Sequence, residues 1–131
     1  MRASPILAAL LLGLFTVAAC GEEEEEEGSA TMRPGDDCLA CHGFGAAGTV
    51  YASTSALAGD GISGVTVRIT DGIGRVVTRT SNSAGNFYTS QSLVPPLLVA
   101  VTSGGTTRTM ADAPSGACNA CHGSGFRVHV P

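Results

Sequence analysis

Short runs of apolar and β-branched residues fill the middle of the chain, and turn residues separate them about every eight to twelve positions, which is the spacing of a small sandwich or barrel. The run from Val65 to Thr70 is the clearest, because Val65, Val67 and Ile69 alternate with polar residues and so share one face of a strand. The same reasoning predicts further strands over Gly48–Ala52, Arg75–Ser81, Asn86–Ser90, Leu97–Thr102 and Thr106–Met110.

Residues that favour turns connect these runs. Asp71–Gly74 and Asn82–Gly85 contain residues that tolerate positive φ, so each is expected to reverse the chain. Ser103–Gly105 is expected to close a hairpin, and Pro95-Pro96 interrupts the chain before the next strand. That strand, Leu97–Thr102, is a continuous apolar run, which is typical of a central strand buried on both faces.

The residue pattern predicts an all-β fold. Beyond residues 1–19 no stretch repeats with helical periodicity, although the two cysteine motifs described below can each form a single turn. Glycine is frequent, with 18 residues, and tryptophan is absent, as expected for a small β-domain with many loops. We therefore expect a β-sandwich of about six or seven strands.

The beginning of the chain reads as a targeting signal. A positively charged start and an uncharged apolar run up to Ala18 form the pattern of a secretory signal peptide. The Val-Ala-Ala-Cys sequence that ends at Cys20 resembles the lipobox of bacterial lipoproteins, which implies removal of residues 1–19 and lipidation of Cys20. The next residue, Gly21, is not Asp, which favours delivery of such a lipoprotein to the outer membrane.

Charge separates a tether from the body of the protein. Eleven acidic residues outnumber seven basic ones, and six of the acids form the run Glu22–Glu27, so we interpret residues 20–37 as the lipidated cysteine and a solvated tether. The five Asp are nearly balanced by the Arg residues, which argues against a nucleic-acid partner. We expect one domain over residues 38–131, with its sandwich over 48–110.

Two Cys-x-x-Cys-His motifs carry the candidate chemistry. They are Cys38-Leu39-Ala40-Cys41-His42 and Cys118-Asn119-Ala120-Cys121-His122. Two thiols on one turn reach the two vinyl groups of a haem and form thioethers, and the adjacent histidine then binds the iron. We therefore predict two covalently attached haem c groups, with His42 and His122 as proximal ligands. Lipidation accounts for the remaining cysteine, Cys20.

Two other uses of the four motif cysteines stay open. The thiols can form a tetrahedral zinc site. In an exported protein they can also oxidise to disulfides, either within a motif or between the two motifs. Neither alternative explains why a histidine follows each pair. Attachment of c-type haem takes place outside the cytoplasm in bacteria, which agrees with the predicted signal peptide.

The sequence offers few further axial ligands. The chain has three histidines and no lysine, so His129 is the only imidazole besides His42 and His122. Alternation in Val128-His129-Val130 places the His129 side chain opposite the valines, so it points outward if they enter the core. Only a short segment separates His129 from His122, so we expect His129 to serve the haem of His42 more easily.

A methionine is the candidate for the last axial position. Met110 follows a predicted strand and precedes a flexible segment that can present its thioether, and the alternatives are Met32 or no further ligand. A Met/His pair raises the reduction potential of a haem relative to a His/His pair.

The segment Thr80–Tyr88, which includes Ser-Asn-Ser-Ala-Gly-Asn-Phe-Tyr, gives the body a family resemblance. Over Gly48–Met110 the chain resembles the carboxypeptidase-regulatory or prealbumin-like β-sandwich. Similar modules are fused to haem motifs in multihaem cytochromes of environmental bacteria. The resemblance implies the fold and says almost nothing about function, because sugar-binding, adhesive and structural modules share it.

Together these features predict a dihaem c-type cytochrome lipoprotein that transfers single electrons in the bacterial cell envelope. Its expected partners are envelope redox proteins and, through Cys20, the membrane. We do not expect an enzyme, because the chain has no nucleophile elbow, zinc-protease motif or phosphate loop, and a dihaem peroxidase needs a buried pocket with an open iron. The alternative is a haem-free binding or structural surface lipoprotein whose sandwich is stapled by disulfides.

Overall fold

Residues 29–131 are described in a computed structural model, which therefore covers the whole predicted β-domain. The predicted signal peptide over 1–19, the lipidation of Cys20 and the Glu22–Glu27 run lie outside the described residues. Within residues 29–131, no helix has the length and apolar character needed to cross a membrane.

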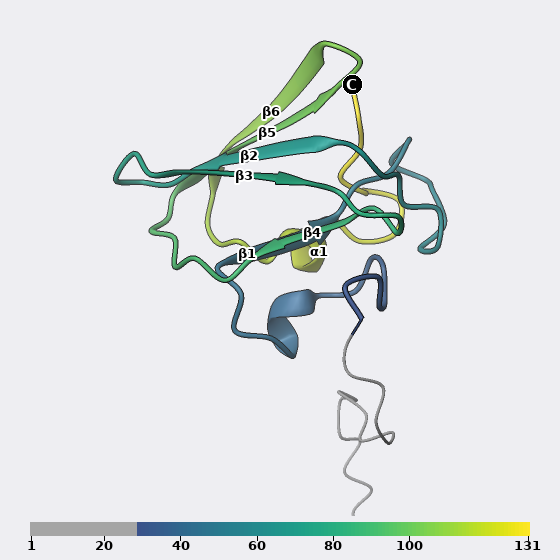
Figure 1. Ribbon diagram of the computed structural model, residues 1–131, viewed down its shortest axis with the longest axis horizontal. Coiled ribbons are helices and arrows are strands. Elements are labelled where there is room, and N and C mark those ends of the chain that lie inside the picture. Colours follow the sequence, from purple (N-terminus) through teal and green to yellow (C-terminus); the bar gives the residue numbers. More distant parts are fainter. Residues whose placement is uncertain (1–28) are drawn as a thin grey trace, which may run out of the picture.

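Strands dominate the described part of the chain (Figure 1). In chain order the elements are η1 (Cys38–Ala40), β1 (Ala46–Thr49), β2 (Thr66–Thr70), β3 (Val76–Thr80), β4 (Asn86–Thr89), β5 (Leu97–Ser103), β6 (Thr106–Ala113) and α1 (Cys118–Cys121). The predicted all-β fold is confirmed. Each cysteine motif also forms a single turn, as expected.

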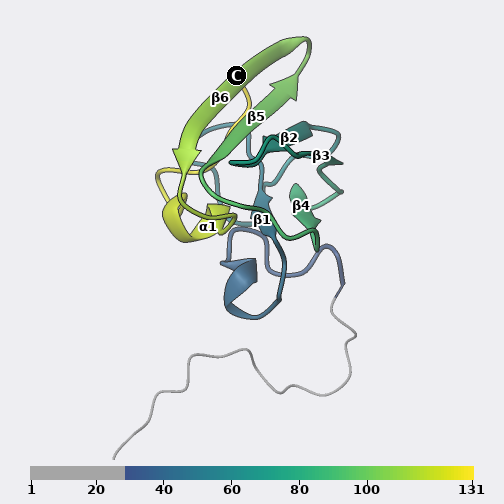
Figure 2. The same cartoon turned by 90° about the vertical axis from the view of Figure 1, so that its left-hand side faces the viewer.

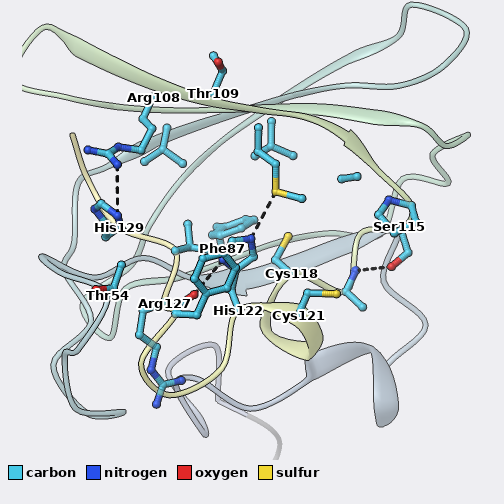
Figure 3. A pocket seen from close by; sticks show the side chains of 18 residues that line it. Thr54, Phe87, Arg108, Thr109, Ser115, Cys118, Cys121, His122, Arg127 and His129 are labelled. Atoms are coloured by element: carbon cyan, nitrogen blue, oxygen red, sulfur yellow. Dashed lines mark hydrogen bonds between the residues drawn. The ribbon is translucent and has the colours of Figure 1, made fainter.

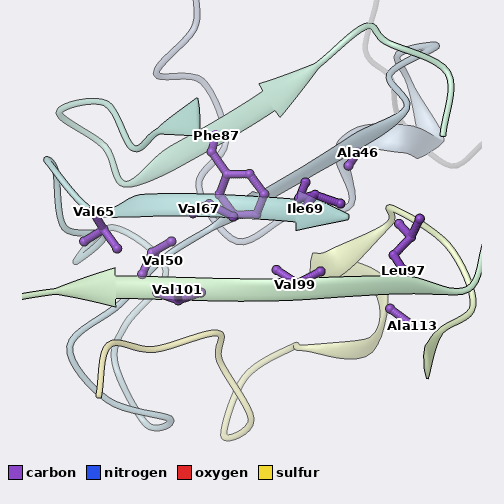
Figure 4. Close-up of a cluster of buried hydrophobic side chains, with 10 residues drawn as sticks. All are labelled: Ala46, Val50, Val65, Val67, Ile69, Phe87, Leu97, Val99, Val101 and Ala113. Carbon is purple, nitrogen blue, oxygen red and sulfur yellow. The ribbon is translucent and has the colours of Figure 1, made fainter. Parts of the chain in front are cut away.

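Two antiparallel sheets enclose the core. One has the strand order β3-β2-β5-β6 and the other pairs β1 with β4. The two-stranded sheet lies beneath the larger one in both views (Figures 1 and 2). The apolar side chains between the sheets are Ala46, Val50, Val65, Val67, Ile69, Phe87, Leu97, Val99, Val101 and Ala113 (Figure 4). The predicted inward face of β2 is therefore confirmed.

The predicted position of β5 is right, but its predicted burial is wrong. β5 lies between β2 and β6, so it is a central strand. Leu97 and Val99 point into the core, whereas Leu98, between them, is 43% exposed. Leu98 lies on the outer face of the sheet, which points away from the β1-β4 layer. An apolar run by itself does not reveal that only one face of the strand is covered.

The first strand is displaced from its predicted place. β1 starts at Ala46 and ends at Thr49, because the next two residues bond to loops instead of extending the ladder. Val50 N donates to Gly85 O at 2.9 Å, and Tyr51 N donates to Val128 O at 2.9 Å. This shift draws the C-terminal segment against the end of β1.

The edge strand β6 is longer than predicted and irregular. Its pairing with β5 shifts register between the Val99–Met110 pair and the Leu97–Ala113 pair, and Asp112 adopts a positive φ of 58° within this bulge. Apart from the buried Ala113, the residues of β6 are exposed. The inner face of β6 is therefore not covered by the β1-β4 sheet.

Candidate cofactor site

The second cysteine motif is held as one turn against β1. Within the turn, His122 N donates to Cys118 O at 2.9 Å. The turn is attached to the sheet just before it begins, where Ala47 N donates to Gly116 O at 3.0 Å and Ala47 pairs with Ala117 in a short parallel bridge. Cys118, Cys121 and His122 are thereby presented to the space beneath β6.

That space is a cavity of about 480 Å³ with a mainly apolar lining (Figure 3). Strands β5 and β6 form one wall, and α1 together with the C-terminal segment forms the other. Cys118, Cys121 and His122 all line it, as do the predicted ligand candidates Met110 and His129. Its volume is within the range of about 300–1,000 Å³ typical of cofactor and small-molecule sites.

The His122 ring makes three contacts, two with Phe126 and one with Met110. Its Nδ1 lies 2.9 Å from the carbonyl oxygen of Phe126, and its ring stacks on the Phe126 ring with centroids 4.7 Å apart and planes inclined by 9°. Because a carbonyl only accepts, Nδ1 carries the proton and donates, which leaves the Nε2 lone pair free to act as an acceptor or ligand. Nε2 faces Met110 Sδ at 3.4 Å.

Strand register accounts for the placement of Met110. Met110 pairs with Val99, whose side chain lies in the core, so Met110 faces the cavity. The bulge follows Met110 and returns Ala113 to the same face, although the two residues are three positions apart.

Burial makes Cys118, the first thiol of the second motif, harder to ionise. Removal from water raises the pKa of Cys118 from 9.0 to about 12, and the neighbouring thiols Cys38 and Cys121 add smaller contributions in the same direction. Cys121, the last residue of the turn, is exposed.

The first motif has a more open setting. η1 is capped by Asp37, whose carboxylate accepts from Leu39 N at 3.1 Å. Burial, with the nearby charge of Asp37 second, raises the pKa of Cys38. Cys41 is in a disulfide, whereas Cys38, Cys118 and Cys121 are free thiols, so no bridge closes either motif or joins the two.

His42 is exposed and belongs to a stack of aromatic rings. Its ring lies 5.0 Å from that of Phe44, and Phe44 lies 4.9 Å from Tyr88, with interplanar angles of 25° and 24°. Neither the large cavity nor a smaller one of about 310 Å³ over β3 and β4 is lined by a residue of the first motif. Of these two cavities, one adjoins the second motif and neither adjoins the first.

A buried polar network ties the two motifs together. The Asn119 amide donates to Asp36 O at 2.9 Å and to Thr49 Oγ1 at 3.1 Å, and its oxygen accepts from Thr49 N at 3.1 Å. Thr49 Oγ1 in turn donates to Asn86 Oδ1 at 2.8 Å and accepts from Gly35 N at 2.9 Å. Asn119 thus connects α1, β1 and the segment that leads into η1.

The remaining ligand candidates lie in different places. Val128 and Val130 pack against the core, as expected, and His129 lines the cavity of the second motif, not the surroundings of His42. Met32 is 40% exposed and lines neither cavity, and its carbonyl accepts from Asn86. The prediction that His129 is more easily placed for the first motif therefore does not agree with its position.

Sequence reasoning missed Asn119 and the environment of Arg108. Asn119 is one of the two variable positions of its motif, so nothing in the motif marks it. Arg108 and Met110 are two positions apart on a predicted strand, and that alternation does indicate a shared face. Among residues 29–131, no group of three or more His, Cys, Asp or Glu side chains is arranged to hold a metal ion.

Comparisons with protein-family models, curated proteins and solved structures found no match to this chain.

Proposed function

We propose that the protein is a dihaem c-type cytochrome that carries single electrons in the bacterial cell envelope. The observation that carries the proposal is that Cys118, Cys121 and His122 line one apolar cavity of about 480 Å³, with the Met110 sulfur 3.4 Å from His122 Nε2. Two free thiols, an oriented imidazole and a thioether are what a covalently attached, six-coordinate haem requires.

Each residue has a separate role in this proposal. Cys118 and Cys121 are the attachment points, and His122 is the proximal ligand, oriented by the carbonyl of Phe126. Met110 would hold the iron together with His122. Haem would supply one-electron redox chemistry when bound, in a mainly apolar site. With both residues bound to the iron, no place would remain for a substrate, which favours an electron carrier over a peroxidase.

The proposal for the first motif rests on its sequence. Cys38, Cys41 and His42 have the same spacing as the second motif, but attachment there requires Cys41 as a thiol, and Cys41 is in a disulfide in this structure. We propose that a dithiol reductant of the envelope opens this disulfide by thiol–disulfide exchange, becoming a disulfide itself, before haem is attached, and that His42 would then hold the haem at the exposed side of the protein.

The proposed location follows from the N-terminal residues. Removal of residues 1–19 and lipidation of Cys20 would anchor the protein to the outer membrane, with redox proteins of the envelope as its partners. The resemblance to carboxypeptidase-regulatory sandwiches agrees with the all-β fold and adds nothing to the choice of partner.

The test is a reduced pyridine haemochrome spectrum with intact mass, made on the full chain from a host that attaches c-type haem. We expect a c-type band and the added mass of two haems. One haem lost in C118A/C121A would identify the second motif. A chain without added mass, in a host that matures a control cytochrome, would overturn the proposal and leave the haem-free binding module.

A further inference from the structure

The end of the cavity that lies away from the thiols is formed by a basic side chain and an imidazole. In Figure 3, Arg108 and His129 lie at one end, Cys118 and Cys121 lie toward the other, and His122, whose Nε2 is 3.4 Å from Met110 Sδ, lies between them. Arg108 Nη1 is 3.4 Å from His129 Nε2. The cavity therefore has a thiol end and a basic end.

Strand register places Arg108 on the inner side of the sheet. Arg108 pairs with Val101, whose side chain is in the core, and Met110 pairs with Val99 in the same way. Side chains directly opposite each other in an antiparallel pair lie on one face. Arg108 thus faces the same side as Met110, although an inner position of a sandwich strand is usually apolar.

Among residues 29–131, no carboxylate neutralises Arg108 there. The residues that line the cavity include no Asp or Glu. In the part of the chain that the structure describes, the salt bridges join Arg33 to Asp36 and Arg75 to Asp71, and Arg108 is in neither. A guanidinium at the edge of an apolar cavity without a carboxylate partner is suited to bind an anionic group of a ligand.

The hydrogen bonds of His129 make it a partner of Arg108 and not a metal ligand. Its Nδ1 lies 2.8 Å from Val130 O, so Nδ1 donates and Nε2 accepts from Arg108. The lone pair that a metal would need is therefore already directed at Arg108. Arg127 is no alternative, because its guanidinium stacks over Tyr51 and points away from the cavity (Figure 3).

We propose that Arg108, held in place by the Nε2 acceptor of His129, binds a propionate carboxylate of the haem attached at Cys118 and Cys121. In haem the vinyl and propionate groups are at opposite edges of the ring, as the thiol and basic ends are in this cavity. The inference rests on the proposed function, because it assigns the orientation of the same cofactor. It replaces iron ligation as the role of His129.

Arg108→Gln tests this proposal, with Arg68→Gln as the matched control. Arg68 is exposed on β2, and its exposed position alternates with the buried Val67 and Ile69, so the control removes the same charge from the outer face. We expect R108Q to lower the reduction potential of one haem, the one with the Met–iron absorption band, because a nearby cation favours the reduced state. R68Q should change neither haem measurably.

The outcomes separate this inference from the function on which it rests. Wild-type chain without two haems overturns the proposed function. If each variant carries two haems and the potentials in R108Q equal those in R68Q, only the propionate site is overturned. If R108Q does not accumulate, Arg108→Lys, which loses the planar fork, and His129→Leu, which loses the acceptor that holds Arg108, are measured instead. The inference expects each to lower the potential of that haem, and no shift in either overturns it.

Discussion

The two Cys-x-x-Cys-His motifs have the same spacing, yet they stand in different surroundings. The second forms α1, is tied to β1, and lines a cavity in which His122 meets Met110. The first forms η1 on the other side of β1 from the large sheet, with His42 exposed against Phe44 (Figures 1 and 2). Identical motifs therefore need not give equivalent cofactor sites.

The difference arises from the sheets and not from the motifs. The two-stranded sheet leaves the inner face of β6 uncovered, and α1 with the C-terminal segment closes that space into a cavity. No strand extends over η1 in the same way. If two haems are bound, we expect the second to be the more shielded from water and to have the higher potential, because methionine ligation and burial both raise it.

The largest expected difference concerns thiol reactivity in the haem-free chain. Only the thiolate form of a cysteine is alkylated. Burial raises the pKa of Cys118 from 9.0 to about 12, so far less of this thiol is ionised in the folded chain. From the ratio of thiolate populations, alkylation of Cys118 at pH 8 should be about a thousandfold slower in the folded than in the unfolded chain. The rate should rise about tenfold per pH unit until the pH approaches 12. Mass spectrometry of timed samples measures this.

The exposed Cys121 is the internal control for that experiment. Equal alkylation rates at Cys118 and Cys121 in the folded chain would contradict the burial of Cys118. The same pKa shift predicts that the free energy of unfolding falls as the pH rises above 9.0. Between pH 9.0 and about 12 the Cys118 thiol ionises in the unfolded chain but stays protonated in the folded chain, which favours unfolding.

His122→Ala and His42→Ala compare the two motifs directly. Removing His122 deletes the hydrogen bond to Phe126 O and the stacked ring, so we expect a loss of about 2 kcal/mol in the free energy of unfolding. Removing the exposed His42 should cost about 0.5 kcal/mol or less. Denaturant unfolding of both haem-free variants measures the difference, and equal losses would show that the two histidines are equally integrated.

Asn119→Ala tests the link between the motifs. The substitution leaves Thr49 N and Asp36 O without their partner, so we expect a loss of about 1–3 kcal/mol. Leu39 has the corresponding position in the first motif, and Leu39→Ala should cost less because Leu39 is only partly buried and joins no such network. Hydrogen exchange at residues 33–37 should rise in N119A alone. Unchanged exchange at residues 33–37 in N119A would show that Asn119 does not link the two motifs.

The smallest predicted effect compares two glycines. A Cβ on Gly48 would lie 2.9 Å from both Cys118 Cβ and Phe87 Cζ, whereas a Cβ on Gly43 would meet nothing within 4 Å. We expect Gly48→Ala to cost about 1–2 kcal/mol through overpacking and Gly43→Ala to change stability by less than about 0.5 kcal/mol. Thermal unfolding of the pair checks this, and a neutral G48A would mean that α1 moves freely on β1.

The sequence by itself determined the β-character, most strand positions and the chemistry-bearing residues, because these depend on local patterns. Alternation at Val65–Ile69 gave the inner face of β2, and Cys-x-x-Cys-His fixes two thiols and an imidazole on one turn. Alternation over 128–130 likewise gave the inward valines around His129.

Only the tertiary structure decided which motif has a cavity and which ligands reach it. The pairing of Met110 with Val99 turns Met110 toward His122, and the bridge between Tyr51 and His129 brings the C-terminal segment beside Arg108. Both are contacts between segments far apart in the chain. A motif specifies the groups that can bond a cofactor, but the number of strands in each sheet decides where space remains for it.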